Sequence, residues 1–253
     1  MPRIALGLEY DGTDFVGWQA QQNGRSVQAE LTEAVSRVAS EPVTLHGAGR
    51  TDAGVHATAQ VAHFDTAACR SERQWVLGIN SNLAPDVAVR WAAEVPAGFD
   101  ARRSALSRSY RYEIVESATR PALTRNRVWW IREALDESLM SAAAVYWLGE
   151  RDFSAFRAAH CQSRTPMRHF MRFAIRRDGE RLALDFRANA FLYHMVRNLV
   201  GALVEIGSGR QPPDWADALM AGRDRQQAAM TAPAQGLTLI AVEYPSSFGL
   251  PVP

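Results

Sequence analysis

The same order of predicted elements occurs twice along this chain of 253 residues. The first half predicts a strand over 3–10, a helix from Ser26, strands over 43–45 and 60–65, a helix over 71–77 and a strand over 87–95. Ser26 is a favourable N-cap, and the apolar residues after it recur at helical spacing. Strand, helix, strand, strand, helix, strand is the order of a ferredoxin-like unit.

The second half repeats that order without repeating the sequence. It predicts a strand over 110–115, a helix over 136–148, strands over 170–176 and 182–187, a helix over 191–206 and a strand over 237–244. The turn Asp178-Gly179 joins the two middle strands. The expected fold class is therefore α/β (α+β), with an N-terminal half over 1–105 and a C-terminal half over 106–253. Two such sheets can join into one mixed, mainly antiparallel sheet with a central cleft.

Composition excludes several classes of protein. The chain is 47% hydrophobic, which suffices for a buried core and argues against disorder. No apolar run reaches the length of a membrane span, and the N-terminus shows no signal segment. Cys69 and Cys161 match no metal or redox spacing, which favours reduced cysteines and a cytoplasmic location.

The numbers of acidic and basic residues are nearly equal, but the basic residues are of one type. The net charge is only +1, and all 28 basic residues are arginine. The absence of lysine excludes Schiff-base chemistry and a P-loop lysine. Arginines without acidic neighbours gather in 101–112 and 153–177, the second of which includes Arg168 and Arg172. These windows are candidate tracks for a polyanion, although solvated faces produce the same pattern.

A short loop between the predicted strands at 43–45 and 60–65 carries one carboxylate, Asp52, with Arg50 two residues before it. Gly49 and Gly54 permit backbone angles and close approaches that a Cβ forbids. A loop held between strands is a common place for a catalytic side chain. The alternative is an Asx-type turn, in which Asp52 bonds its own backbone.

The nine residues GRTDAGVHA (49–57) resemble the signature of the tRNA pseudouridine synthases that modify the anticodon arm. Five further segments resemble the same family in the same order: 10–15 with 17–19, 107–112, 152–157, 189–198, and 231–234 with 236–237. The resemblance covers nearly the full chain. It implies the same two-part architecture, a homodimer, and a tRNA substrate modified at positions 38, 39 and 40.

The resemblance also implies a role for each of five residues. Asp52 is the nucleophile, and Arg50 helps to displace the target nucleotide. Tyr110 stacks on the base, Arg197 pairs with the catalytic aspartate, and Leu237 lines the pocket. Without the resemblance, the sequence predicts an ordinary strand tyrosine at Tyr110 and an exposed helix arginine at Arg197.

The isomerisation of uridine makes few demands on an enzyme. It breaks an N-glycosidic bond, turns the base and forms a C–C bond through C5, so nothing is oxidised and no cofactor or metal is needed. It requires an ionised carboxylate, stabilisation of an electron-poor sugar, and a group that removes the C5 proton. The base must also leave its stack. Whether Asp52 attacks C1′ or C6, or first removes a ribose proton, is open at this stage.

Two other classes of protein compete with this interpretation. A metal-dependent hydrolase would use Asp52, His56, His63 and Asp65 as ligands, but no metal-binding motif accompanies them. An RNA-binding module without catalysis suits ferredoxin-like sheets. However, the sequence has no RNP-type aromatic motif, and that class leaves the pairing of Asp52 with Arg197 unexplained.

Overall fold

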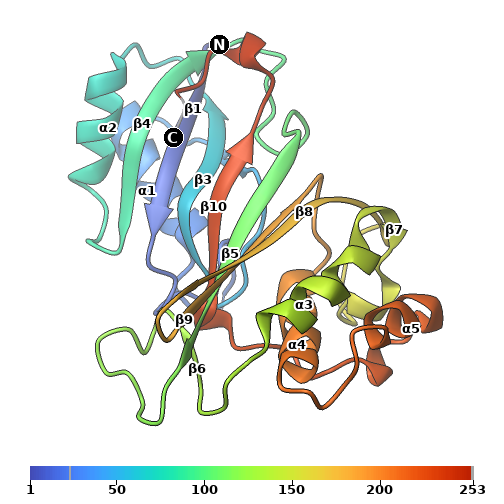
Figure 1. The fold of residues 1–253 in the computed structure, drawn as a ribbon. Helices are drawn as coiled ribbons and strands as arrows, with labels where there is room; N and C mark the ends of the chain where they lie inside the picture. The colour runs from blue at the N-terminus through green and yellow to red at the C-terminus, as the bar shows by residue number, and fades with distance from the viewer. Residues whose placement is uncertain (23, 252–253) are drawn as a thin grey trace. The chain divides into compact units, whose positions relative to one another are not determined.

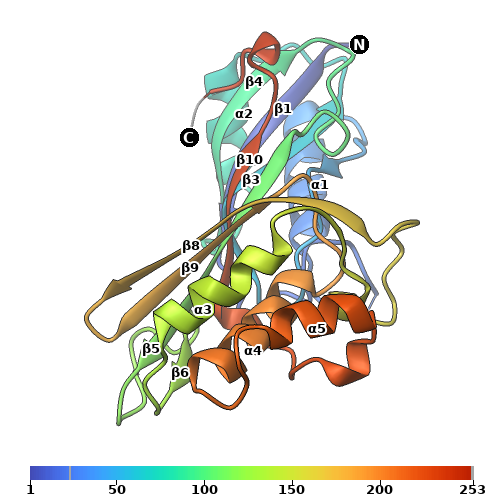
Figure 2. The same cartoon turned by 45° about the vertical axis from the view of Figure 1, so that its right-hand side comes forward.

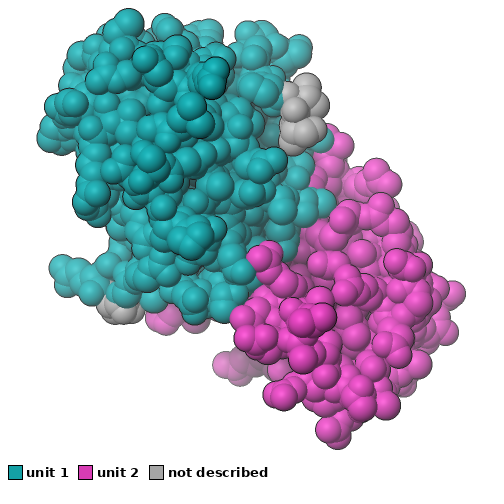
Figure 3. Space-filling model, turned by 90° about the vertical axis from the view of Figure 1, so that its left-hand side faces the viewer, with its two compact units in different colours: residues 1–107, 238–253 teal, residues 108–237 magenta. Residues whose placement is uncertain are grey.

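The computed structural model describes residues 1–22 and 24–251. It divides into two compact units, coloured separately in Figure 3. Unit 1 comprises residues 1–107 and 238–253, and unit 2 comprises residues 108–237. The boundary near 107 lies close to the expected division after 105. The last strand differs from the expectation, because residues from Thr238 onward group with the N-terminal unit.

Unit 1 has the predicted βαββαβ order. Its elements are β1 (Arg3–Tyr10), α1 (Val27–Ala39), β2 (His46–Gly47), β3 (His56–Asp65), α2 (Glu72–Asn80) and β4 (Val87–Val95). β1 lies between β4 and β3, antiparallel to both, and β2 is antiparallel to β3. The two helices lie on one face of this sheet (Figures 1 and 2). Large apolar side chains between the layers, including Phe64 and Trp75, are almost completely buried.

Two strand predictions in unit 1 differ from the structure. Residues 43–45 form no strand, and β2 is only His46–Gly47. The reason is that the Val43 N–H donates to Ser36 Oγ of α1 (3.2 Å) instead of joining a ladder. β3 starts at His56, four residues before the predicted position, because β10 (Leu237–Glu243) pairs with it there in parallel.

Unit 2 contains the remaining strands and three α-helices among the described residues. These are β5 (Ser107–Glu116), β6 (Trp129–Ile131), α3 (Glu137–Ala144), β7 (Gly149–Asp152), β8 (Met167–Asp178), β9 (Arg181–Ala188), α4 (Met195–Gly207) and α5 (Trp215–Gly222). The strand order is β5-β9-β8-β7, all antiparallel, and β6 adds to β5 in parallel. α3, α4 and α5 lie together, as Figure 2 shows.

The long helix α4 starts four residues later than predicted. His194, the residue before it, has a left-handed backbone with φ of 60°. Non-glycine residues adopt this conformation only rarely. The apolar residues Phe191 and Leu192 therefore lie before the turn at Tyr193 and His194 and outside α4, although their spacing is helical.

The predicted fold class is confirmed. Each unit combines helices with a mainly antiparallel sheet, and the parallel pairings of β10 with β3 and of β6 with β5 make the sheet structure mixed. The cleft expected between the halves stays a prediction.

The two serines that precede α1 and α2 allow a matched test of helix capping. Ser71 and Gln74 form a reciprocal capping box at α2. Ser26 precedes α1 as predicted, but it makes no cap bond, and its buried Oγ has no partner among the described residues. We expect Ser71→Ala to lower the free energy of unfolding by about 1 kcal/mol. Ser26→Ala is expected to leave it unchanged or raise it, because it removes an unpaired hydroxyl. Urea unfolding of both variants checks this, and an equal loss contradicts it.

Candidate active site

In unit 1, Asp52 begins a tight turn. The Val55 N–H donates to the Asp52 carbonyl oxygen (3.1 Å), and Gly54 has a φ of 77° that suits glycine. The Asp52 residue is partly exposed, and Arg50 is exposed. Because a main-chain carbonyl closes this turn, its geometry does not require the carboxylate of Asp52 as an acceptor.

Thr51 holds the turn on the sheet. Its hydroxyl lies 2.8 Å from the Tyr10 phenol at the end of β1, and its carbonyl accepts from the Trp18 N–H (3.0 Å). Gln60 of β3 donates to the Gly49 carbonyl (2.9 Å). Burial raises the pKa of Tyr10 to about 12, so this phenol stays neutral near pH 7. Thr51 and Gly49, which precede Asp52, are thus held by hydrogen bonds to β1, β3 and the segment after β1.

Two glycines bring the segment after β1 into direct contact with this turn. A Cβ on Gly12 would lie 2.0 Å from the Val55 carbonyl oxygen. A Cβ on Gly17, whose φ is 108°, would lie 2.6 Å from the Thr51 carbonyl oxygen. Gly49 differs from the expectation: its φ is not positive, and a Cβ there would meet open space. Gly54 retains the backbone freedom that the sequence predicts.

His56, at the end of the signature segment, is buried and bridges back to the same region. Its Nδ1 accepts from the Gly12 N–H (3.0 Å) and lies 3.1 Å from an Asp11 carboxylate oxygen. The imidazole therefore links the start of β3 to the end of β1. From the sequence alone, His56 is predicted only as a candidate metal ligand.

The other candidate metal ligands have separate functions in the fold. His63 Nδ1 accepts from the Ala101 N–H (3.1 Å), and its ring stacks on His46. Asp65 makes an ion pair with Arg3 at 2.7 Å. Within the described ranges, no three His, Cys, Asp or Glu side chains are placed to hold a metal ion.

In unit 2, Tyr110 of β5 and the turn before α4 contact each other. Tyr110 is buried, and its ring meets that of Phe191 edge to face, with centroids 5.2 Å apart. Such a contact fixes the plane of the tyrosine ring. Two of the family-like segments, 107–112 and 189–198, are therefore joined by an aromatic pair.

Arg197 contacts a third family-like segment, residues 231–237. Its Nε–H donates to the Ala232 carbonyl oxygen (2.8 Å), and the Ala232 N–H donates to the Arg197 carbonyl oxygen (3.1 Å). Tyr112 donates to the Pro233 carbonyl (2.8 Å), and its ring would be 2.7 Å from a Cβ on Gly236. Leu237 follows at the start of β10 and is buried.

The five predicted site residues are thus divided between the units. Arg50 and Asp52 belong to unit 1, whereas Tyr110, Arg197 and Leu237 belong to unit 2. The ion pair between Asp52 and Arg197 stays a prediction.

The arginine windows separate into structural and exposed side chains. Arg168 is buried and donates to the Thr165 carbonyl (2.9 Å) and to Ser163 Oγ (2.6 Å), while Arg176 pairs with Asp185. The phosphate contact predicted for Arg168 does not fit this burial, because both terminal nitrogens donate inside the fold, while its buried Nε has no partner among the described residues. Arg157, Arg111 and Arg177 are likewise engaged by carbonyls or carboxylates.

Arg164 and Arg172 have a different environment. Both are exposed, and neither has an acceptor within hydrogen-bonding distance in the part of the chain that the structure describes. They are the members of the second window whose guanidinium groups remain available to an anion.

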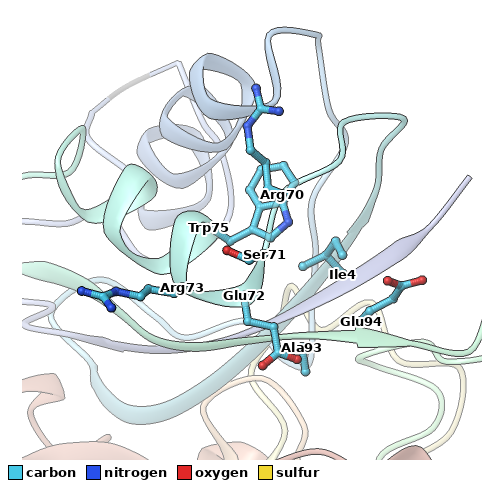
Figure 4. A pocket seen from close by; sticks show the side chains of 8 residues that line it. All are labelled: Ile4, Arg70, Ser71, Glu72, Arg73, Trp75, Ala93 and Glu94. Carbon is cyan, nitrogen blue, oxygen red and sulfur yellow. The ribbon is translucent and has the colours of Figure 1, made fainter.

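One cavity of about 500 Å³ lies in unit 1, away from Asp52. Its lining includes Ile4, Trp75 and four charged residues, Arg70, Glu72, Arg73 and Glu94; Figure 4 shows Arg73 pointing away from the two carboxylates. Ile4 is near the opposite end of β1 from Tyr10, at a separation of roughly 20 Å for six residues of strand. The cavity is therefore separate from the signature loop.

A family model described as tRNA pseudouridine synthase matches residues 8–102 and 143–245. The match includes every predicted site residue except Tyr110, which lies between the two matched ranges. Together with the anchored Asp52 loop, it defines the class of protein: a tRNA pseudouridine synthase, which is an isomerase.

Curated relatives specify the family further. The tRNA pseudouridine synthase A of Cronobacter sakazakii is 52% identical over 251 residues, which are 99% of this chain and 93% of that protein. The tRNA pseudouridine synthase A of Aeromonas salmonicida is 53% identical over 249 residues, or 98% and 93% of the two chains. The chain belongs to the tRNA pseudouridine synthase A family. This membership excludes the metal-dependent hydrolase and the non-catalytic RNA-binding module.

Among solved structures, a Cbf5-Nop10-Gar1 complex contains a chain that matches with a TM-score of 0.39 and 10% identity. The match covers 93% of this chain and 48% of that chain, so this chain spans about half of its length. The likeness is too weak to add to the family assignment. None of the helices in the described ranges is long and apolar enough to span a bilayer.

Gly17 and Gly49 provide a matched pair for testing the loop contact. We expect Gly17→Ala to lower the free energy of unfolding by about 1–3 kcal/mol, because a Cβ would strain the backbone and overlap the Thr51 carbonyl. Gly49→Ala is expected to leave the free energy of unfolding near that of the unchanged protein, because the space is open. Urea unfolding of both variants measures the difference. Equal stability of the two variants would contradict the close approach.

Proposed function

We propose that this enzyme converts uridine to pseudouridine at positions 38, 39 and 40 in the anticodon stem-loop of tRNA, with Asp52 as the nucleophile and without a cofactor. The observation that carries the proposal is the signature loop, in which Thr51 is anchored by Tyr10 and Trp18 while the Asp52 residue remains partly exposed. A carboxylate held in this way can meet a substrate without reorganising the loop.

The proposed isomerisation changes the bonds of the nucleotide in successive steps. The bond between N1 of the base and C1′ of the ribose breaks, the base turns, and a bond forms between C5 and C1′. The proton on C5 then leaves to a base and N1 takes up a proton, so the product has the same atoms as the substrate. In this scheme Asp52 supplies the negative charge that the electron-poor sugar or the base requires.

The other site residues act on the position of the nucleotide. Tyr110, whose ring is oriented by Phe191, stacks on the target base. Arg50 is exposed and helps to displace the nucleotide from its stack. Arg197 pairs with the Asp52 carboxylate and keeps it ionised, and Leu237 forms an apolar wall.

The tRNA contacts that lie outside the reacting nucleotide are assigned to exposed arginines such as Arg172.

We also propose that the enzyme is a cytoplasmic homodimer. The molar mass in solution tests the dimer, and a mass equal to one chain excludes it. Cell fractionation tests the location, and recovery of the enzyme outside the cytoplasm excludes it.

The nucleophile is tested by Asp52→Asn. This change keeps the shape of the side chain and removes its charge, so we expect normal folding and tRNA binding but no pseudouridine. The assay measures tritium release from C5-labelled uridine in tRNA with uridine at 38, 39 or 40. Asp65→Asn is the matched control, since Asp65 pairs with Arg3 and has no proposed role. More than a trace of turnover by Asp52→Asn would exclude Asp52 as the essential carboxylate. Product at other positions would exclude the proposed specificity.

The arginine assignment is tested by comparing Arg172→Ala with Arg168→Ala. Arg172→Ala is expected to weaken tRNA binding, to leave the saturated rate unchanged, and to flatten the slope of log affinity against log salt by about 0.7–0.9. Arg168→Ala is expected to lower the free energy of unfolding by about 1–3 kcal/mol, because carbonyls inside the fold lose their donor. Affinity at several salt concentrations and urea unfolding separate the two effects. An unchanged salt slope for Arg172→Ala would place the RNA track elsewhere.

A further inference from the structure

Arg225 lies outside every family-like segment, yet its guanidinium joins two of them, 189–198 and 231–237. It belongs to a short 3-10 helix, Arg225–Gln227, that follows α5. One terminal nitrogen donates to the Ala229 carbonyl (2.9 Å), and the other donates to Asn198 Oδ1 (3.0 Å) and to Thr231 Oγ1 (2.9 Å). All of these acceptors are neutral.

The surroundings of Arg225 are unfavourable for a charge. The side chain is partly buried, and this burial lowers the pKa of Arg225. None of the described carboxylates forms an ion pair with it, in contrast to Arg210, which pairs with Glu205 and Glu133. A partly buried cation without an opposite charge is costly unless its donors are satisfied. The neutral acceptors satisfy them, and the planar fork of arginine is suited to reaching several at once.

Asn198 is the centre of this network. It is completely buried on α4, directly after Arg197. Its amide nitrogen donates to the Phe156 carbonyl (2.8 Å), and its amide oxygen accepts from Arg225 and from Thr231 Oγ1 (2.7 Å). Arg225 therefore ties the residue after Arg197 to the residue before Ala232.

The network holds the residues next to Arg197 and Ala232, and these two residues bond each other. Ala232 accepts from Arg197 Nε–H and donates to the Arg197 carbonyl. The segment lies directly on α4, since a Cβ on Gly201 would be 2.0 Å from the Met230 carbonyl oxygen. The Ala232 carbonyl therefore accepts from the Arg197 Nε–H, and Thr231, the residue before Ala232, is itself bonded to Arg225 and Asn198.

We propose that Arg225 is a positioning residue for Arg197, acting through Thr231 and Ala232 to hold the guanidinium fork in the direction that the reaction requires. This inference rests on the proposed role of Arg197 as the partner of the catalytic carboxylate. A fork displaced by about 1 Å can cost about 10²-fold in rate without changing what binds.

The first experiment measures the single-turnover rate at saturating tRNA and the tRNA dissociation constant. Arg225→Ala and Arg225→Lys are expected to lower the rate by about 10²-fold at an unchanged dissociation constant, since an ammonium lacks the fork. Arg210→Ala is the matched control and should retain the full rate. Full rate for Arg225→Ala, or weakened binding at full rate, would overturn the inference.

A second pair of variants keeps the test valid if the Arg225 variants fail to fold. Thr231→Val preserves the shape of the side chain but removes the hydroxyl that joins Arg225 to Asn198, whereas Thr231→Ser retains that hydroxyl. We expect Thr231→Val to lose rate at unchanged binding and Thr231→Ser to stay near the unchanged enzyme. Equal rates for the two variants would overturn the inference.

A double-mutant cycle shows whether Arg225 acts through Arg197. If it does, Arg197→Lys combined with Arg225→Ala should be no slower than the slower single variant. Multiplied losses would overturn the inference, because they indicate independent effects. Full activity of Arg197→Lys alone would refute the proposed role of Arg197. A slow Arg197→Lys with a fully active Arg225→Ala would instead refute only the role of Arg225.

Discussion

Main-chain contact between two loops of unit 1 is the constraint on which the Asp52 loop depends. Gly12 and Gly17 let the segment after β1 touch the carbonyls of Val55 and Thr51, at separations that no larger residue allows. Contacts between backbones leave little room for adjustment, because the atoms involved cannot rotate away as a side chain can. The position of Asp52 is therefore determined by residues some forty positions earlier in the chain, and the two sequence segments act as one structural element.

Local patterns predicted the elements of this protein well, and non-local pairing explains most of the errors. The order of strands and helices followed from apolar spacing, and the capping box at Ser71 is a local device. The start of β3 at His56 depends on pairing with Thr238, a residue far away in sequence. The start of α4 depends on the left-handed His194, although helical spacing continues through the preceding turn. The periodicity of apolar residues predicts neither the distant pairing of β3 nor the left-handed backbone of His194.

In the candidate site, sequence patterns also fail to predict which arginine side chains are engaged inside the fold. Arg168 and Arg172 occupy one acid-free window, but the first donates inside the fold and the second faces solvent. Charge spacing cannot distinguish them, because internal carbonyl acceptors leave no mark in the sequence. Arg225 was missed for the same reason: its partners are an amide, a hydroxyl and carbonyls, which no charge pattern reveals. Asp52 was found because a contiguous segment specifies its loop.

The return of the last strand to the first unit has a consequence for synthesis on the ribosome. His56 and Ala57 receive their parallel partners only from Thr238 and Leu239 of β10. At typical translation speeds, roughly 10–40 s pass between the two segments. During that interval the strand that follows the Asp52 loop has an unpaired edge, and such edges attract other chains. A nascent chain therefore carries this open edge until β10 emerges, and a product truncated before β10 would keep it permanently.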